Sequence, residues 1–357
     1  MRVAEACQYA PPYGGNFLSS LLSIEKSAEK TGEDLVLIYI LPEEARARKW
    51  AQDLAKKNKT YFIHSGRLRN NIDIIRICIK NKIDILHVHF YGLSSTFMVG
   101  WFCKTRVINH FHNTLDRPGK IHYLLNKILA FKATRLVGCS STVRDTLITA
   151  GFSPTKCYYI TNCIDFTRLD YVKSKSPFNN NKTNILILGT DFYRKGVDIA
   201  LKAIKPLVEK YDLCLQIVSV DPNKTRDLVK EILFSDLDWV AFPEPINNVG
   251  DYYRSSSIFL SPSLAEGLSY AVIESIYCNC MTIKSDISSM NYDLIGEEQI
   301  TVRLSIENLK NKIESVLCMS NTEKNKVIAN LKTQIIDKYS VENWGKKVFN
   351  LYKEIAK

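Results

Sequence analysis

Residues 184–204 read NILILGTDFYRKGVDIALKAI, and this stretch holds one complete strand–loop–helix unit. The apolar run that ends at Gly189 has the length of a buried strand. After the loop, apolar side chains recur at helical spacing, which predicts a helix near Val197–Lys210. A strand that leads directly into a helix is the repeating unit of a parallel α/β sheet.

The same alternation continues on both sides of this unit. In the first half of the chain, strands are predicted at Arg2–Cys7, Leu35–Ile40, Thr60–Ile63, Ile85–His89, Arg106–Asn109, Leu136–Gly138 and Cys157–Ile160. In the second half they are predicted at residues 184–189, Leu213–Val220, Trp239–Phe242, Ile258–Leu260 and Met281–Ile283. Further helices are predicted at Phe17–Lys30, Ile121–Lys132, Asn223–Phe234, Tyr270–Cys278 and Ile306–Leu317.

One break in this pattern divides the chain. Residues 171–183, YVKSKSPFNNNKT, have no apolar period, which is typical of a linker. The sequence therefore predicts two doubly wound, Rossmann-like α/β domains that face a central cleft, residues 1–168 and 184–335, with the linker at 169–183. Residues 336–357 are predicted to end in a helix capped by Ser340. Ligands of such sheets bind beyond the carboxyl ends of the strands, so we expect a nucleotide-sized ligand in the cleft.

The composition is that of a globular protein, with 46% hydrophobic and 24% charged residues. The net charge of +11 lies almost entirely in the first half: residues 1–170 hold 24 lysines and arginines against 14 aspartates and glutamates, and the rest holds 24 against 23. This asymmetry indicates either a solvated basic face or an anionic partner. Nucleic acid is disfavoured as that partner, because no nucleic-acid-binding motif accompanies the charge.

The ten cysteines are scattered and form no C-x-x-C pair. The N-terminus lacks the apolar core of a signal peptide, and no apolar run is long enough to cross a bilayer. We therefore expect reduced, mostly buried thiols in a cytoplasmic protein that associates with a membrane at most peripherally.

Residues 261–280, SPSLAEGLSYAVIESIYCNC, carry the strongest chemical signal. Glu266 and Gly267 are expected to open a helix after a short loop, and Glu274 follows eight positions after Glu266. This separation is about two helical turns, so both carboxylates would share one helix face. Carboxylates without a partner cation favour hydrogen bonds to vicinal hydroxyl groups, as on a sugar or a ribose. Taken alone, the pattern also fits an ordinary amphipathic helix with two acidic residues.

In its context the stretch resembles the Glu-x7-Glu motif of retaining glycosyltransferases with the GT-B fold, most closely those of glycosyltransferase family 4. Three further segments match that family in the expected order. They are the first-strand loop YAPPYGGNF (9–17), the segment YYITNCIDFTRL (158–169), in which Cys163 replaces the usual glycine, and the donor loop LILGTDFYRKGVDIALKAI (186–204). The C-terminal helix is similar to the family's final helix, which crosses back to the first domain.

The resemblance implies roles for the charged residues of these motifs. Lys195 would neutralise the diphosphate of the donor as the glycosidic bond breaks. Glu266 would hydrogen-bond the donor sugar, and Glu274 would bind the ribose hydroxyl groups. Thr190 stands where the family usually carries an arginine, and Arg194 is the candidate substitute for it.

The resemblance also implies backbone contacts to the donor. Gly14 and Gly15 would approach the diphosphate closely, since they lack a side chain. Gly267, Leu268 and Ser269 would offer backbone N–H groups near the start of the helix.

Four histidines end two neighbouring predicted strands, in HVHF and INHFHN. We expect His87, His89, His110 and His112 to gather at the carboxyl edge of the first sheet. The resemblance implies that His112 contacts the donor sugar near the reacting carbon, and we expect the other three to be structural or peripheral. Paired histidines raise the question of a metal site, but no carboxylate or cysteine completes an obvious one, so we expect no metal ion.

The resemblance implies a retaining, metal-independent hexosyltransferase (EC 2.4) that needs no cofactor and uses a nucleotide sugar as co-substrate. A UDP-sugar is favoured and a GDP-sugar is the alternative donor. The acceptor would be a saccharide or a polyprenyl-diphosphate-linked saccharide in bacterial capsule, exopolysaccharide or lipopolysaccharide biosynthesis. The basic first domain would dock on an anionic membrane surface through residues 43–59, with Trp50, and the Arg67/Arg69 loop. A catalytically silent GT-B scaffold subunit and a GT-B epimerase or phosphorylase are the alternatives.

Overall fold

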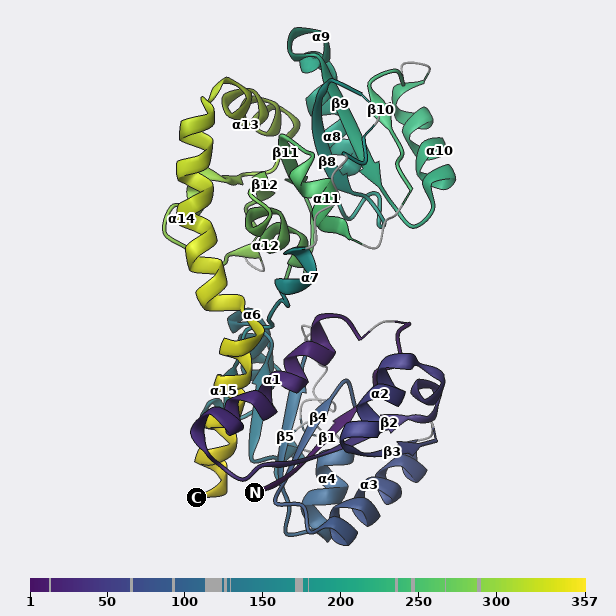
Figure 1. Ribbon diagram of the computed structural model, residues 1–357, viewed down its shortest axis with the longest axis vertical. Helices are drawn as coiled ribbons and strands as arrows, with labels where there is room; N and C mark the ends of the chain where they lie inside the picture. Colours follow the sequence, from purple (N-terminus) through teal and green to yellow (C-terminus); the bar gives the residue numbers. More distant parts are fainter. Residues whose placement is uncertain are drawn as a thin grey trace. The chain divides into compact units, whose positions relative to one another are not determined.

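The computed structural model in Figure 1 describes the chain except residues 13, 65–66, 92–93, 113–123, 125–126, 129, 171–175, 179, 235–236, 245–247, 267 and 288–289, and the side chains of 67–68 and 94–97. The chain divides into two units. Unit 1 comprises Met1–Cys163 and Tyr339–Lys357, and unit 2 comprises Ile164–Lys338. Each unit is built around its own parallel sheet.

The sheet of unit 1 has the strand order β3-β2-β1-β4-β5-β6-β7. Its strands are β1 (Arg2–Cys7), β2 (Val36–Pro42), β3 (Lys59–Ile63), β4 (Ile85–His89), β5 (Arg106–Phe111), β6 (Arg135–Gly138) and β7 (Cys157–Tyr159). The order reverses between β1 and β4, and ligands of doubly wound sheets bind at such a reversal. Successive side chains of a strand point to opposite faces, so Glu5 shares the sheet face of Val3 and Cys7.

Helices cover both faces of this sheet. The face of Val3 and Cys7 packs against α1 (Gly15–Thr31) and the C-terminal α15 (Val341–Ala356), which lie side by side in Figure 1. The opposite face packs against α3 (Arg67–Asn81) and α4 (Ser94–Phe102). The other helices of the unit are η1 (Glu43–Ala47), α2 (Lys49–Lys57), α6 (Ser141–Thr149) and η2 (Pro154–Lys156).

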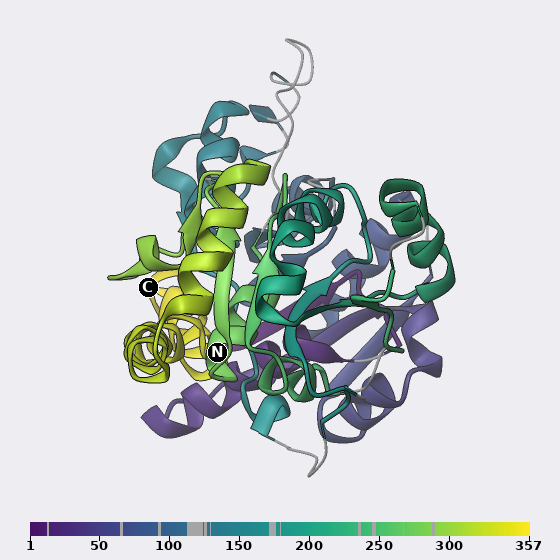
Figure 2. The ribbon, with the colours of Figure 1, turned by 90° about the horizontal axis from the view of Figure 1, so that it is seen from above.

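The sheet of unit 2 has the order β10-β9-β8-β11-β12-β13 and reverses between β8 and β11. Its strands are β8 (Thr183–Leu188), β9 (Leu213–Val218), β10 (Val240–Ala241), β11 (Ile258–Ser261), β12 (Met281–Ser285) and β13 (Thr301–Val302). Figure 2 shows helices on both sides of these strands. They are α7 (Thr167–Asp170), α8 (Val197–Ile204), η3 (Lys205–Leu207), α9 (Val208–Tyr211), α10 (Pro222–Leu233), α11 (Val249–Arg254), α12 (Tyr270–Tyr277), η5 (Glu297–Gln299), α13 (Ile306–Cys318) and α14 (Asn321–Tyr339).

The structure confirms every predicted strand, with ends that differ by at most two residues. The helix predicted at Val197–Lys210 is wrong in its length, because Pro206 cannot donate a helical hydrogen bond and the segment divides into α8, η3 and α9. No range was predicted from the sequence for β13 or for the helices α2, α3, α4, α6, α7, α11 and α14. The helix predicted at Ile121–Lys132 lies largely outside the described residues.

Two further expectations are confirmed. All ten cysteines are free thiols, and eight of them are buried. Ser340 caps α15, because its hydroxyl accepts a hydrogen bond from the backbone N–H of Asn343 at 3.3 Å. In the part of the chain that the structure describes, every helix is too short or too polar to cross a bilayer.

Candidate active site

Two loops of unit 2 come together at the reversal of its sheet. One follows β8 and carries residues 189–196, and the other follows β11 and carries residues 262–269. Gly196 allows their close approach: its φ is +67°, and a Cβ atom there would lie 2.0 Å from the carbonyl oxygen of Pro262. The backbone N–H of Leu264 also donates to the carbonyl oxygen of Arg194 at 2.9 Å. These two contacts hold the loop after β8 against the loop after β11.

Lys195 and Glu266 form an ion pair across these loops. The Lys195 Nζ donates to Glu266 Oε1 at 2.5 Å, and the side chains are 21% and 9% exposed. The hydroxyl of Ser263 donates to the same carboxylate oxygen at 2.9 Å. These two residues are 71 positions apart in the sequence, and the structure brings them into contact. The family resemblance had implied that both belong to one donor site. Ser263 is a contact that the sequence analysis missed.

Arg194 adds a second cation to this cluster. Its Nη1 lies 3.4 Å from Glu266 Oε2 and donates to the carbonyl oxygen of Ala265 at 2.9 Å. Its Nε donates to Asp191 Oδ2 at 2.6 Å, and this hydrogen bond is the main reason why the pKa of Arg194 is raised. Thr190, at the position where an arginine is usual, is exposed. The guanidinium group of Arg194 therefore lies beside Glu266, and its role as the substitute for the usual arginine stays a prediction.

The expectation that Glu266 opens a helix is wrong. The helix α12 begins at Tyr270, so Glu266 lies in the preceding loop and does not share a helix face with Glu274. In this loop the Glu266 carboxylate accepts hydrogen bonds from Lys195 and Ser263 and does not lie on the helix surface. The eight-position separation of Glu266 and Glu274 could not show that Glu266 lies in a loop, because the separation in sequence is the same for helical and extended residues.

Glu274 lies on α12 and is buried, with 6% of its surface exposed. Its carboxylate is hydrogen-bonded by the guanidinium group of Arg168 and, at 3.4 Å, by the hydroxyl of Tyr253. The premise that the two acids lack a partner cation is therefore wrong, because both are paired. Arg168 and Tyr253 were not predicted, and no local signal points to Arg168, which is 106 positions away from Glu274.

The N-terminus of α12 is the remaining feature of the cluster in unit 2. Ser269 occupies the capping position, but its hydroxyl makes no capping bond. Its Oγ atom is buried and has no hydrogen-bond partner among the described residues. The first N–H groups of a helix have no partner within the helix and attract anions. Leu268 is half-buried beside them, and Gly267 lies outside the described residues.

In unit 1, the loop after β1 leads into α1 through Gly14 and Gly15. The hydroxyl of Tyr9 donates to the carbonyl oxygen of Gly14 at 3.1 Å. Gly15 has a φ of +55°, and a Cβ atom at Gly14 would lie 2.6 Å from the side chain of Leu18. The positive φ of Gly15 therefore favours glycine there, and a side chain at Gly14 would require Leu18 to move.

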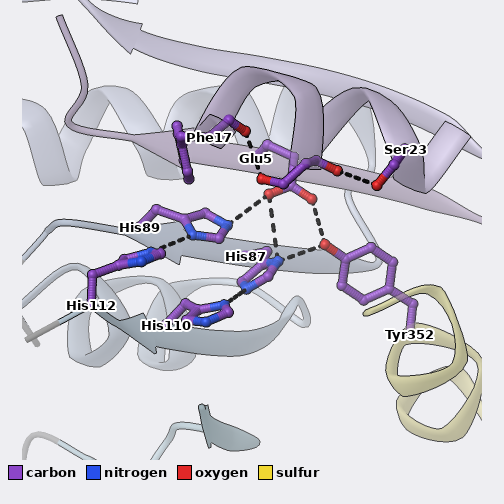
Figure 3. A network of polar contacts seen from close by, with 9 residues as sticks. Glu5, Phe17, Ser23, His87, His89, His110, His112 and Tyr352 are labelled. Carbon is purple, nitrogen blue, oxygen red and sulfur yellow. Dashed lines mark hydrogen bonds and ion pairs between the residues drawn. The ribbon is translucent and has the colours of Figure 1, made fainter. Parts of the chain in front are cut away.

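The predicted gathering of histidines is confirmed (Figure 3). His89 Nδ1 lies 3.1 Å from His112 Nε2, and His110 Nδ1 lies 3.3 Å from His87 Nε2. Strand register explains the cluster: Glu5 pairs with His87 across β1 and β4, and His89 pairs with His110 across β4 and β5. Because side chains alternate along a strand, these residues all point to the face covered by α1 and α15.

One buried carboxylate lies at the centre of this cluster. Glu5 is 0% exposed, and its Oε2 lies 3.1 Å from His89 Nε2 and 3.4 Å from His87 Nδ1. Its Oε1 accepts a hydrogen bond from the hydroxyl of Tyr352, on α15, and this hydroxyl also lies 2.6 Å from His87 Nδ1. No carboxylate or cysteine was found from the sequence that completes an obvious site with these histidines, but strand register places Glu5 and Cys7 beside His87 and His89.

Burial keeps His89, His110 and His112 in their neutral forms. Desolvation, with a smaller contribution from His87, lowers the pKa of His112 to about 3, although a hydrogen bond with Asn162 acts in the opposite direction. Desolvation also lowers the pKa of His89 and that of His110 well below the ordinary value. An imidazolium ion would lose its hydration in this environment, so the neutral form is favoured.

Some of these groups are close enough to share a metal ion. Ligand-type atoms of His87, His89 and His110 lie within 4.8 Å of one another, as do those of Glu5, Cys7 and His89. The same nitrogen and oxygen atoms, however, already face one another at hydrogen-bonding distance. A hydrogen-bonded network therefore accounts for the arrangement, and we do not assign a metal to it.

Family models match the two halves of the chain in succession. Residues 41–168 match Glycosyltransferase Family 4, and residues 171–333 match Glycosyl transferases group 1. A capsular polysaccharide biosynthesis glycosyltransferase, CapH of Staphylococcus aureus, is 25% identical over 60% of this chain and 62% of its own length. An N-acetylgalactosaminyltransferase of Campylobacter jejuni, named for its N,N'-diacetylbacillosaminyl-diphospho-undecaprenol acceptor, is 24% identical over 62% of this chain and 60% of its own length. The chain thus spans about three fifths of the length of these curated relatives.

Solved structures share the fold over the whole chain. A glycosyltransferase from Rickettsia africae has a TM-score of 0.82 at 17% identity, covering 100% of this chain and 98% of its own. HepE from Anabaena, solved in complex with UDP, has a TM-score of 0.75 at 14% identity, covering 99% and 100%. The two models together match most of the residues in order, and the fold is that of GT-B enzymes. The chain therefore belongs to the glycosyltransferases with the GT-B fold, in the group that the family 4 and group 1 models describe.

Proposed function

We propose that this protein transfers a hexosyl group, with retention of configuration and without a metal ion, from a UDP-sugar to a saccharide or polyprenyl-diphosphate-linked acceptor in the assembly of a bacterial surface polysaccharide. The observation that carries the proposal is the contact between Lys195 and Glu266 at the reversal of the sheet in unit 2. This position is where doubly wound sheets bind nucleotides.

The cluster suits a donor diphosphate. Lys195 and Arg194 provide two positive charges against the carboxylates of Glu266 and Asp191, so the group is close to neutral before the donor binds. Phosphate oxygens would bind the two cations and the N-terminus of α12, which stabilises the negative charge that develops on the leaving group. Glu266 would then accept hydrogen bonds from the donor sugar, since carboxylates bind vicinal hydroxyl groups well.

The identities of donor and acceptor are supported by relatives. HepE, which shares the fold, was solved with UDP and with UDP-glucose. CapH is named for capsular polysaccharide biosynthesis, and the Campylobacter transferase is named for an acceptor linked to undecaprenol through a diphosphate. A lipid-linked acceptor would also agree with the positive charge of residues 1–170, because both the lipid diphosphate and the cytoplasmic leaflet are anionic.

Incubation with a panel of UDP- and GDP-sugars and a lipid-diphosphate-linked saccharide tests the proposal. We expect release of UDP, a product whose new linkage keeps the anomeric configuration of the donor, and unchanged turnover in EDTA. The absence of donor turnover with every sugar would instead favour a silent scaffold subunit. An epimerised sugar, or a sugar phosphate formed with inorganic phosphate, would favour the epimerase or phosphorylase alternative.

The role of Glu274 gives a first prediction. If it binds the ribose hydroxyl groups, Glu274→Ala should weaken the binding of UDP by about 1–3 kcal/mol, the usual loss for a buried hydrogen bond to a charged group. Calorimetric titration with UDP measures this change. Glu314→Ala is the matched control, because that carboxylate pairs with Lys210 on the surface. Equal UDP affinities of the two variants would refute the ribose role.

A surface of unit 1 suits the anionic membrane that we propose as a partner. Trp101 and Phe131 are 59% and 69% exposed, and Phe102, next to Trp101 in the chain, is 65% exposed. The Lys132 Nζ lies 5.2 Å from the ring centre of Trp101 and 5.6 Å from that of Phe131. Aromatic rings with lysines beside them are typical of interfacial contacts. Trp50, which we expected at such a contact, instead packs inward, and its indole N–H donates to Pro11.

Vesicle binding tests this surface. Trp101→Ser combined with Phe131→Ser should weaken binding to phosphatidylglycerol-containing vesicles by about tenfold or more, because each large side chain contributes about 2 kcal/mol when it leaves water. Phe234→Ser, which removes an 83% exposed aromatic ring in unit 2, is the matched control and should leave binding unchanged. Binding should also weaken as salt is added. Equal binding of wild type to neutral vesicles would contradict the proposal.

A further inference from the structure

We propose that Glu5 is a positioning residue, which acts through His89 to hold the ring of His112 in one orientation and in the form protonated at Nε2. This inference rests on the proposed function, in which His112 contacts the donor sugar. It concerns residues of unit 1 alone, and it assigns a role to the buried carboxylate that the proposed reaction does not otherwise use (Figure 3).

A continuous chain of hydrogen-bonding atoms joins Glu5 to His112 through His89. Glu5 Oε2 faces His89 Nε2 at 3.1 Å, and His89 Nδ1 faces His112 Nε2 at 3.1 Å. Glu5 and His89 are 0% exposed, so water does not compete for the contact between them, while the contact between His89 and His112 is part-buried. The three residues come from β1, from the end of β4 and from the residue that follows β5, which are neighbouring strands of one sheet. The contacts therefore depend on the rigid part of the fold.

The chemistry of the groups gives this chain a direction. An ionised carboxylate can only accept, so His89 must donate from Nε2. A neutral imidazole carries one N–H, and His89 Nδ1 is then an acceptor that requires a proton from His112 Nε2. His112 Nδ1 is left as an acceptor. The side chain of Asn162 is a further hydrogen-bond partner of the His112 ring.

Which nitrogens of His89 and His112 donate, and which accept, depends on the charge of Glu5. A neutral group in its place could donate to His89 Nε2, and the protons of both rings would then move to the opposite nitrogens. The carboxylate thus selects one of two hydrogen-bond patterns that fit the same heavy-atom positions. Shape alone, without the negative charge, would leave both patterns populated.

A second branch from the same carboxylate provides an internal control. The hydroxyl of Tyr352 donates to Glu5 Oε1 and lies 2.6 Å from His87 Nδ1, and His87 Nε2 lies 3.3 Å from His110 Nδ1. Both contacts of His87 in this branch are buried. The branch also begins at Glu5, but it leads to α15 and His110 and not to His112. Removing it should leave the protonation of His112 unchanged.

The arrangement suits the proposed reaction. In an oxocarbenium-like transition state the sugar gains positive charge, so a cationic imidazole beside it would be unfavourable. A neutral ring of fixed orientation can still hydrogen-bond a hydroxyl group. Burial among three other imidazoles keeps His112 neutral, and the chain from Glu5 decides which nitrogen carries its proton.

Nitrogen-15 NMR of the ring nitrogens in histidine-labelled protein tests the inference without any assay of activity. In the wild type we expect His112 to be protonated at Nε2 and unprotonated at Nδ1. Glu5→Gln should give a mixture of both forms, and Tyr352→Phe should keep the wild-type pattern. Thermal unfolding of each variant confirms that it is folded. A wild-type ring protonated at Nδ1, or an unchanged His112 in folded Glu5→Gln, would overturn the inference.

Activity provides the second measurement. Glu5→Gln should lower kcat by about 10- to 100-fold, the usual cost of a misplaced catalytic group, and should change KM for the donor little. Tyr352→Phe, which removes a donor to the other oxygen of Glu5, should lower kcat far less than Glu5→Gln does. His64→Gln, which changes an exposed histidine outside this network, should leave kcat and KM unchanged. If the NMR pattern holds and no donor is turned over, the proposed function fails and the positioning chain stands. If Glu5→Gln alters the NMR pattern but keeps full kcat, the positioning role is refuted.

A bound metal would also refute it. Elemental analysis of the purified protein should give well under one equivalent of zinc, because the proposed protons occupy the atoms that would bind the ion. One equivalent of zinc that is lost on His89→Phe would show a metal centre in place of the hydrogen-bonded chain.

Discussion

Replacing Lys195 by methionine should lower the turnover of the nucleotide sugar by at least about 100-fold, since a positioned charge on the leaving group is worth about 3–4 kcal/mol in a site of this kind. Methionine keeps the length of the side chain but removes the ammonium group, which is hydrogen-bonded to Glu266 at 2.5 Å. Release of UDP from the active donor under saturating conditions measures the effect. This substitution addresses the contact on which the proposed function depends.

Stability must be separated from chemistry in this variant. Without Lys195, the carboxylate of Glu266 keeps Ser263 and the more distant Arg194 as partners, so we expect the fold to persist. Lys202→Met removes an exposed lysine of α8 and is the matched control. It should retain full turnover. A folded Lys195→Met protein with near-normal turnover would mean that the diphosphate is bound elsewhere.

Lowering the pH from 6.5 to 5.5 should reduce the free energy of unfolding by about 3 kcal/mol. The folded protein keeps His89, His110 and His112 neutral, because burial lowers the pKa of each ring. In the unfolded chain the same rings have ordinary pKa values near 6.5 and take up protons. The unfolded state therefore gains about 1 kcal/mol per ring over this interval, and stability falls as the pH falls.

Urea unfolding at a series of pH values measures this loss. His110→Phe should reduce the pH dependence by about 1 kcal/mol over the same interval, because one buried titratable ring is removed. His64 is exposed, so His64→Gln is the matched control and should leave the pH dependence unchanged. A free energy of unfolding that is constant between pH 7.5 and 5.5 would show that these histidines are not held neutral in the folded state.

The partners of the candidate site could be predicted only in part. Lys195 and Glu266 were assigned to one site through a resemblance to a family, and the structure places them in contact. The cation beside Glu274 was missed, since Arg168 lies on a short helix before the linker and has no pattern that marks it. Glu5 carries a weak signal: it is the one charged residue inside the strand RVAEAC that ends up fully buried.

The amino-acid sequence by itself determined the strands other than β13, part of the helices and the parallel α/β class, because periodicity and turn residues act over a few neighbouring positions. It also indicated which strand ends carry histidines. Only the tertiary structure decided that Glu266 lies in a loop, that Glu5 meets His89 from 84 positions away, and that Tyr352 closes the network from 347 positions away. These contacts depend on strand order, register and helix packing, which are set by the burial of the whole core and leave no trace in local spacing.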